Sequence, residues 1–414
     1  MKNFLPLLFL IVTVNVYSQN TNSPYSILGI GDLETNFYNR TAGLANTGVA
    51  YRSERFMINN NPASYTGMQQ QFFAFELSSR AQFVNYTGQP ITGFSNSSKD
   101  FAIKHLSLGT KINKFWGSSI GLMPFSSASY AFTSFKNIQG TNTSVPAQYE
   151  GNGGVNQIYW GNAFQITKHF SVGINASYLF GSLTQTETLL TSDLQTSLVT
   201  TNQIFLKNFY FTYGAQYYFP VNKHWDLSLG ATYSMKQKLA AEYNVSVTDN
   251  STDILKNTIT RTDVFRLPTA TAVGISLKKD KKYTFSADYK YQAWTSTNVV
   301  GVNYSLQNSS RGSVGFEISN NKQYINQIYE RSNIQAGAYY GNSYLNVHGQ
   351  QLKDMGLTLG YGLNSFKNPL GVNIAMELGQ RGTTQNNLIK ERYINFTFTI
   401  SHHDFWLTKG RKYE

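Results

Sequence analysis

The dominant pattern in this 414-residue chain is an alternation of apolar and polar positions from about residue 70 onward. In residues 225–235 and again in 370–379, apolar side chains occupy every second position and small or polar residues mostly fill the positions between them. Successive side chains on a β-strand point to opposite faces, so each segment is predicted to be a strand with one apolar face. Soluble β-sandwiches can alternate in this way too. The long, aromatic and nearly charge-free apolar faces favour a barrel with lipid outside and water inside.

The alternation divides the chain into zones. Residues 19–68 contain many turn formers and little alternation, which predicts a folded plug. Residues 69–408 contain the alternating segments and are predicted to form the barrel, and residues 409–414 form a short basic tail. Short polar connections separate pairs of segments, and longer polar stretches at 135–154, 184–202 and 244–262 are expected to be loops on the outside. The predicted fold is all-β: a transmembrane antiparallel β-barrel of about fourteen strands, with the N-terminal plug in its lumen.

Composition supports this fold class. Charged residues make up 14% of the chain and aromatic residues 15%, and there are 33 glycines. A disordered chain would not contain so many aromatic residues, and a helical bundle would not tolerate so much glycine. Membrane barrels use both, because aromatic girdles lie at the two interfaces and small residues fit a crowded lumen.

Residues 1–18 are predicted to be a cleaved signal peptide. Lys2 precedes the apolar residues 4–14, and small residues ending at Ser18 suit cleavage before Gln19. No later segment has the ~20 apolar residues of a membrane helix. A closed barrel can still cross a membrane, because closure satisfies every backbone group. The expected location is therefore the outer membrane of a Gram-negative cell.

The charge and cysteine content exclude several kinds of site. The net charge of +12 is spread over short connections, such as Lys278–Lys282, and the tail, so no nucleic-acid surface is expected. The absence of cysteine excludes a disulfide scaffold and a thiolate metal site.

No enzymatic chemistry is predicted. Residues 117–121 match the G-x-S-x-G pattern of hydrolases, but that motif requires a strand-to-helix elbow and here it begins a strand. The six histidines form no H-E-x-x-H pair, and no glycine-rich loop precedes a helix. We expect no catalytic residue, no metal site and no cofactor.

Several stretches, taken in their order along the chain, resemble a known family. A plug segment at 42–50 is followed by Asn60, Asn61, Pro62 and Ala63, and the later stretches are 151–154, 178–181, 267–268, 287–294, 377–382 and 391–393. This series resembles the outer-membrane fatty-acid and hydrocarbon transporters of the FadL/TodX type, particularly those of Bacteroidetes-like bacteria. The opening segment Ser23–Asp32 is a departure, because the enterobacterial transporters lack it.

The resemblance implies a monomeric barrel of fourteen strands whose N-terminal hatch blocks the lumen. A hydrophobic substrate would enter from outside, pass the hatch at Asn60, Asn61, Pro62 and Ala63, and leave sideways where a strand kinks inward. The turn itself follows from the residues alone, since Asn tolerates left-handed geometry and Pro fixes φ. Its place in the permeation path rests on the resemblance.

The third predicted strand contains a candidate for the inward kink. It includes Gly121, Met123, Pro124 and Phe125. Proline cannot donate a hydrogen bond to the ladder and is confined to edges and bulges. Pro124 should therefore interrupt pairing and leave an opening lined by Met123 and Phe125. A bulge that only ends the strand early is the alternative.

Charged residues on predicted inner faces form a further candidate set. Glu76 and Arg80 share the inner face of the first strand, and Asp288 and Lys290 share that of the ninth. Such pairs usually tie a barrel wall to its plug. Alternatively, one of the lumenal cations holds a substrate carboxylate through a charge-assisted pair.

Two functions from different classes remain open. The first is passive transport of fatty-acid-like or hydrocarbon molecules, whose partners are the hydrophobic ligand and outer-membrane lipid. The second is a docking subunit of an outer-membrane protein complex, as in type IX secretion, where relatives of this architecture serve. An aqueous porin is disfavoured, because residues 19–68 are expected to fill the lumen.

Overall fold

The computed structural model describes residues 23–405, apart from 71, 89–95, 138–139, 141–143, 190–197, 250–251, 298–299, 302–303, 325–326 and 366–369. The predicted signal peptide 1–18, residues 19–22 of the predicted plug and the tail 409–414 lie outside the described residues. Helical structure is limited to short 3-10 turns. No helix in the described ranges is long and apolar enough to cross a membrane.

The segment that precedes the wall, residues 23–70, contains four short elements: η1 (Pro24–Ile27), β1 (Asp32–Leu33), η2 (Arg40–Leu44) and η3 (Pro62–Gly67). We call this segment the plug. The wall follows. Its strands are β2 (Phe72–Thr87), β3 (Ser97–Lys111), β4 (Trp116–Ser127), β5 (Tyr130–Asn137), β6 (Ser144–Gln165), β7 (Phe170–Leu189), β8 (Leu198–Pro220), β9 (Trp225–Ser234), β10 (Gln237–Asp249), β11 (Thr252–Leu267), β12 (Ala270–Lys279), β13 (Tyr283–Gln292), β16 (Ser309–Tyr324), β17 (Gln327–Val347), β18 (Gln350–Asn364), β19 (Leu370–Gly382) and β20 (Lys390–Phe405). Smaller elements in the connections are η4 (Trp294–Thr297), β14 (Val300–Gly301), β15 (Tyr304–Leu306) and η5 (Gln385–Asn387).

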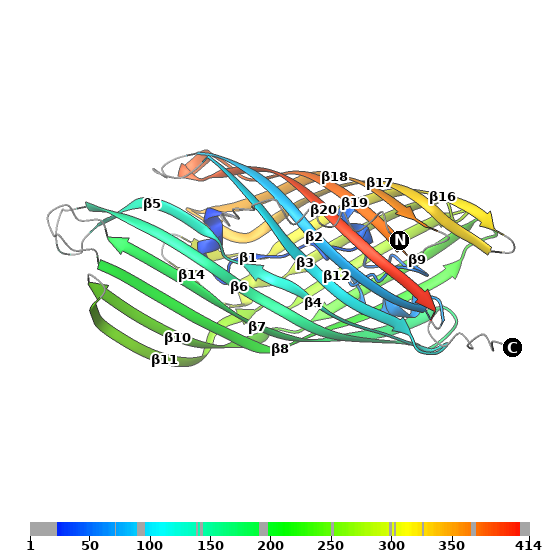
Figure 1. Ribbon diagram of the computed structural model, residues 1–414, viewed down its shortest axis with the longest axis horizontal. Helices are drawn as coiled ribbons and strands as arrows, with labels where there is room; N and C mark the ends of the chain where they lie inside the picture. The colour runs from blue at the N-terminus through cyan, green and yellow to red at the C-terminus, as the bar shows by residue number, and fades with distance from the viewer. Residues whose placement is uncertain are drawn as a thin grey trace, which may run out of the picture.

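These strands form a closed antiparallel barrel of 14 strands, as the sequence predicted (Figure 1). β20 pairs with β2 along its full length and closes the barrel. β8 pairs with β9 near the short-turn end and with β10 farther out, so β9 and β10 together make one wall strand. β11 with β12 and β4 with β5 likewise count as single, interrupted wall strands.

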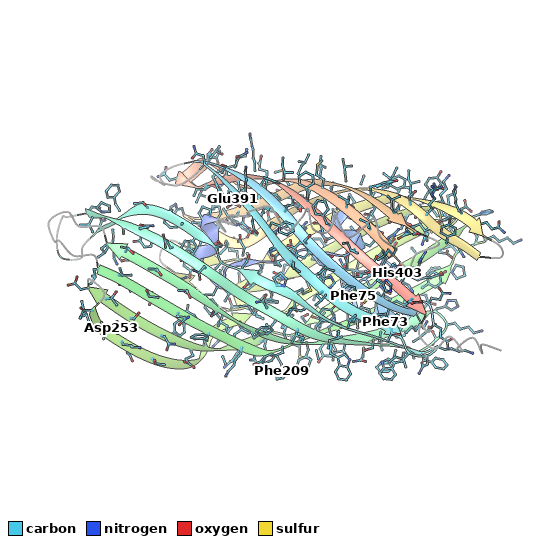
Figure 2. The ribbon with its side chains drawn as sticks, viewed as in Figure 1. Phe73, Phe75, Phe209, Asp253, Glu391 and His403 are labelled. Atoms are coloured by element: carbon cyan, nitrogen blue, oxygen red, sulfur yellow. The ribbon has the colours of Figure 1, made fainter. Side chains whose placement is uncertain are left out.

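The structure confirms both the two-residue period of the predicted alternation and the outward direction of its apolar side chains. In β9, Leu229 and Tyr233 face outward and are exposed, whereas Ser228 and Ser234 face inward and are buried. Phe209 projects from the outer face of β8 (Figure 2). Exposed leucines and aromatics are unfavourable in water, and an apolar outer belt of this kind suits lipid contact.

The polar stretches expected as outside loops are largely strands instead. β6, β7 and β8 contain 22, 20 and 23 residues, although a tilted membrane strand needs only ~9–11. Asp253 lies near the tip of β11, beyond the apolar belt (Figure 2). Both faces of such extensions meet water or other polar groups, so their sequences lack an apolar face. They still form ladders, because threonine and other β-branched residues favour extended backbone.

The depth dependence of the outer face can be tested with one arginine at two positions. Leu229→Arg places a charge midway along β9, and we expect it to lower the free energy of unfolding by about 2–4 kcal/mol in a bilayer. Val221→Arg is the matched control, since Val221 is similarly exposed but lies in the turn before β9; it should cost about 0–1 kcal/mol. Urea unfolding in phospholipid vesicles, followed by tryptophan fluorescence, measures both. Equal costs would contradict the assignment of the belt.

Candidate functional site: the plug and the break in the barrel wall

The predicted hatch turn begins η3 and is bonded to the wall. The Asn61 side chain accepts from the backbone N–H of Ala63 (3.0 Å) and so caps this 3-10 turn. Its Nδ2 donates to the carbonyls of Val49 (2.8 Å), Ala215 (3.0 Å) and Ala231 (3.3 Å), which joins the turn to β8 and β9. Gly214 of β8 allows this approach, since a Cβ there would lie 2.1 Å from Asn61 Oδ1.

The other hatch residues are buried inside the plug. Asn60 Nδ2 donates to the carbonyl of Asn46 (3.0 Å), and its Oδ1 accepts from Asn39 (3.0 Å). Pro62 occupies the first position of η3, where its fixed φ suits a helical turn and its missing N–H costs nothing. The turn predicted from sequence is therefore present, with its polar groups paired inside the barrel.

Each predicted lumenal charge faces the plug. Glu76 Oε1 accepts from the backbone N–H of Met57 (3.1 Å). Asp288 Oδ2 accepts from the consecutive N–H groups of Gly48 (2.7 Å) and Val49 (3.0 Å). Lys290 Nζ lies 5.1 Å from the ring centroid of Phe37. All of these contacts join a wall strand to the plug.

Arg80 belongs to a larger cluster centred on the plug carboxylate Glu34. Glu34 pairs with Lys104 (2.7 Å) and Arg80 (3.8 Å), and it accepts from Tyr38 (2.5 Å). Arg80 also pairs with Asp100 of β3 at 3.6 Å. Burial alone would raise the pKa of Glu34, but the charges of Lys104 and Arg80 outweigh it and lower that pKa to about 2.

A second charged cluster, around Arg40, was missed at the sequence level. Arg40 of η2 pairs with Glu317 (3.0 Å) of β16 and Glu330 (2.7 Å) of β17, and its Nε donates to Tyr51 (3.1 Å). The Arg40 and Glu317 side chains are only 2% and 1% exposed. The available signal was an arginine in an otherwise uncharged stretch of the plug, but nothing in the sequence indicates its partners nearly 300 residues away.

The wall is interrupted near the predicted kink, although Gly121 still pairs with Ser107 of β3. The ladder between β3 and β4 runs only from Leu106↔Leu122 to Lys111↔Gly117. β4 continues along β6, with a register shift between Pro124 and Ser126. Within the described residues, the β3 edge at residues 97–105 pairs with β2 alone, and β5 pairs with β6 alone. We call this unpaired interval between β3 and β4–β5 the wall break.

The wall break lies at the depth of the apolar belt and next to an apolar interior. Ile103 and Phe101 on the free edge of β3 face outward and are 68% and 50% exposed. On the other side, Met123 is buried, and Phe125 packs edge-on against Tyr210 (5.8 Å between centroids). Phe125 and the plug residue Leu33 contact an inward-facing apolar cluster, whose buried members include Val155, Leu179, Leu183, Leu206, Leu239, Leu267, Trp294 and Leu345.

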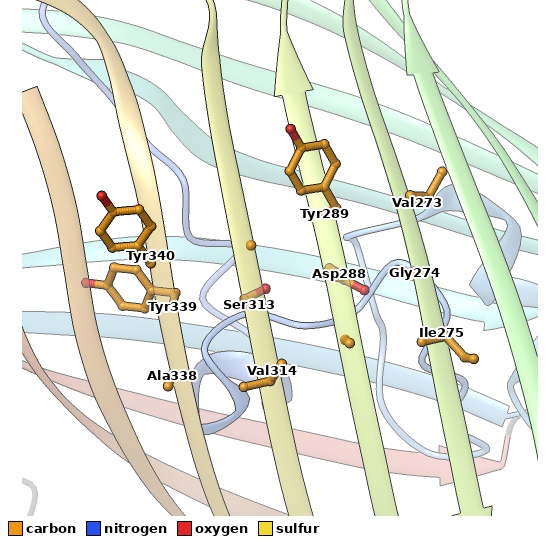
Figure 3. A pocket seen from close by; sticks show the side chains of 12 residues that line it. Val273, Gly274, Ile275, Asp288, Tyr289, Ser313, Val314, Ala338, Tyr339 and Tyr340 are labelled. Atoms are coloured by element: carbon orange, nitrogen blue, oxygen red, sulfur yellow. The ribbon is translucent and has the colours of Figure 1, made fainter. Parts of the chain in front are cut away.

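Two cavities accompany these features. A polar cavity of about 100 Å³ lies in the lumen between the plug residues Asp32–Asn36 and the wall. A shallow groove of about 690 Å³ lies over β12, β13, β16 and β17 (Figure 3). Tyr289, Val314 and Tyr340 line the groove and are each half exposed on the outer face of the barrel. The groove therefore faces lipid.

Comparisons with known proteins agree on the fold. The family model described as BamG matches residues 1–414. No curated protein matches the sequence significantly. The Pseudomonas putida toluene transporter TodX is similar in structure, with a TM-score of 0.59 at 14% identity over 91% of this chain and 100% of that one.

Two further solved structures are similar to about the same degree. The CymD monoaromatic hydrocarbon channel has a TM-score of 0.56 at 15% identity, covering 91% of this chain and 98% of its own. A Pseudomonas aeruginosa FadL homologue has a TM-score of 0.58 at 12% identity, covering 88% of this chain and 97% of its own. The predicted likeness to FadL/TodX-type barrels is confirmed at the level of the fold.

Removing one member of the Arg40 cluster should destabilise the barrel strongly. Arg40→Met leaves two carboxylates with little compensation, and the expected loss in unfolding free energy is about 3–5 kcal/mol. Adding Glu317→Gln and Glu330→Gln should recover much of it, because no buried charge then remains unpaired. Arg331→Met, at an exposed arginine of β17, is the control and should change stability by less than ~0.5 kcal/mol. Urea unfolding in detergent measures all of them, and no recovery in the triple variant would contradict the assignment.

Acid should weaken the attachment of the plug at Glu34. A carboxylate whose pKa is lower when folded stabilises the fold above its ordinary pKa and loses that contribution as pH falls. For Glu34 the loss should extend from pH 4.5 down to about 2. Melting temperatures of wild type and Glu34→Gln should therefore differ near neutral pH and converge across this interval. A difference that stays constant with pH would contradict the role given to the Glu34 charge.

Proposed function

Because this chain belongs to the BamG family and folds like the hydrocarbon and FadL-type channels, we propose that it is a passive outer-membrane channel for hydrophobic small molecules. The observation that carries the proposal is the wall break, which lies between the apolar cluster inside the barrel and the apolar belt outside it. A fatty-acid-like or hydrocarbon molecule suits this path at every point, since it needs only apolar contact.

The plug and the wall break would have different roles in such a channel. The plug fills the lumen with buried polar contacts at Asn61, Glu76 and Asp288, so it opposes passage of water and polar solutes. A hydrophobic molecule that reaches the apolar cluster would leave through the wall at Pro124 into the membrane. No energy source is required, because transfer from water to hydrocarbon is downhill by about 25 cal/mol per Å² of apolar surface.

The remaining sequence-based expectations belong to this proposal. Cleavage after Ser18 would release a mature chain that enters the outer membrane of a Gram-negative cell as a monomeric barrel. The proposed partners are membrane lipid and the hydrophobic ligand. Glu76, Asp288 and Lys290 are assigned to holding the plug, since each already contacts it.

A docking subunit of an outer-membrane complex is the second candidate. Two observations favour it. The family model that matches the chain is BamG, whereas the transport channels are similar only in fold. In addition, the groove lined by Tyr289, Val314 and Tyr340 lies on the lipid-facing wall, where another membrane protein could pack. Purification from native membranes separates the two functions: bound lipid-like ligand supports a channel, and stoichiometric protein partners support docking.

Restoring the ladder at the wall break should abolish transport. Pro124→Val supplies the missing N–H donor. We expect at least a tenfold loss (~1.4 kcal/mol) in the rate of uptake of N-phenyl-1-naphthylamine. The heat-dependent shift in electrophoretic mobility should show that the barrel is still folded. Pro220→Val is the control, because Pro220 ends β8 at the short-turn end of the wall, on a different strand from the break. Unchanged uptake in Pro124→Val would contradict the proposal that the ligand leaves through the wall at this position.

A further inference from the structure

We propose that an anionic phospholipid binds the outer wall of the barrel, with its phosphate at Lys279 and Lys282 and an acyl chain in the groove over β12, β13, β16 and β17. The site goes beyond the proposed function, because it can be occupied in a channel and in a docking subunit alike. It lies across the barrel from the wall break: β4 to β12 separate the break from β13 one way round, and β3, β2 and β20 to β16 the other.

The floor of the groove is made of small residues. On adjacent strands, Tyr289 pairs with Gly312 and Gly312 with Tyr340, so a glycine lies between two outward-facing tyrosines (Figure 3). Neighbouring strands are ~4.8 Å apart, which places the two tyrosine backbones about 10 Å from each other. A Cβ at Gly312 would meet no atom within 4 Å. Ala287 and Ala338 lengthen this slot in the next row of the ladder.

An acyl chain matches the groove in chemistry and in size. Val273, Ile275 and Val314 line it, and its volume of about 690 Å³ is larger than the gap left by one missing side chain. Volumes of ~300–1,000 Å³ are typical of sites that hold whole small molecules. The groove opens on the hydrocarbon of the membrane, so acyl chains are the molecules that reach it first. One chain stays in place when its headgroup is also held.

The headgroup partner is a lysine cluster at the short-turn end of the same strands. Four of the five residues 278–282 are lysines. Lys279 Nζ lies 5.2 Å from the ring centroid of Trp225, and Lys282 Nζ lies 5.1 Å from that of Tyr283. Cation–π contacts of this kind orient an ammonium group without neutralising its charge. Aromatic and basic residues together mark the depth of lipid headgroups.

The two ammonium groups are available to an anion. Asp280, the carboxylate of this turn, pairs with His224 (2.5 Å). Within the described residues, neither Lys279 nor Lys282 has an ion-pair partner. A phosphatidylglycerol headgroup has a net negative charge and is attracted to such a cluster. A phosphatidylcholine headgroup contains its own ammonium, which the lysines repel.

The lysines and the groove are separated by the depth of one leaflet. On β12, Ile275 and Val273 lie four and six residues from Lys279, which is ~13 and ~20 Å along the strand. A strand tilt of about 40° reduces these lengths to depths of roughly 10 and 15 Å. Half of a ~30 Å hydrocarbon core is ~15 Å. An acyl chain whose phosphate lies at Lys279 therefore reaches the groove.

The headgroup contact can be tested by native mass spectrometry of the purified protein titrated with phosphatidylglycerol or phosphatidylcholine. Lys279→Gln/Lys282→Gln should weaken phosphatidylglycerol binding roughly 30-fold and leave phosphatidylcholine binding unchanged. Lys114→Gln/Lys168→Gln is the control, because it removes the same charge from exposed lysines of two other short turns, and it should bind phosphatidylglycerol as the wild type does. An equal loss in the control, or equal affinity of the wild type for both lipids, overturns the proposal.

The acyl-chain contact is tested by filling the groove. Gly312→Leu adds a side chain where the structure has room for it, and it should weaken phosphatidylglycerol binding at least about fivefold. Ala176→Leu is the matched control: Ala176 of β7 lies between Trp160 and Phe211, outside the groove, so binding should not change. The heat-dependent shift in electrophoretic mobility checks that both variants are folded. Undiminished binding in Gly312→Leu overturns the proposal.

A third measurement identifies the occupant in native membranes. A photo-crosslinking amino acid at Tyr340, which borders the groove, should attach to phospholipid. Attachment to a protein instead would make the groove a protein interface and overturn the lipid assignment. None of these measurements involves uptake, so their outcome is independent of the channel proposal.

Discussion

The controlling constraint on this molecule is that a chain inside a membrane must pair its own backbone N–H and C=O groups. Helices and closed barrels meet that requirement, and here β20 pairs with β2 to complete the closure. The requirement also explains why an interruption in the ladder is significant. An unpaired backbone group costs several kcal/mol in hydrocarbon, so the free edge of β3 and the kink of β4 need other partners. The plug supplies some of them through β1.

The plug is held in place by the same requirement that buried polar groups be paired. Asp288 of the wall accepts from the plug's backbone N–H groups at Gly48 and Val49. In the other direction, the plug's Asn61 side chain donates to wall carbonyls of β8 and β9. The buried charges of Arg40, Glu317 and Glu330 compensate one another. Buried ion pairs add little net stability, but they fix one arrangement, because any misplacement exposes an unpaired charge. The position of the plug is therefore set by its polar and ionic partners more than by hydrophobic burial.

The sequence predicted those parts of the structure that depend on local periodicity. The fold class, the outward direction of Leu229 and Tyr233, and the interruption near Pro124 all follow from alternation or from the missing proline donor. The long outer strands were mistaken for loops, since segments with water on both sides carry no periodic signal. Partners distant in sequence were also missed. Arg40 is recognisable as an unusual plug residue, but its pairing with Glu330 depends on barrel register, which no local pattern encodes.

The opening segment Ser23–Asp32, by which the chain departs from the family pattern, has a structural role at the interrupted wall. A straight third strand would leave no interruption in the ladder. This chain instead keeps Pro124 and adds a segment, Ser23–Asp32, whose end occupies the position the kink vacates. That segment joins β4 through backbone bonds on one edge, and within the described residues it is tied to β3 on the other edge by ion pairs. Glu34, the residue after β1, provides those ion pairs, with Lys104 of β3 and Arg80 of β2.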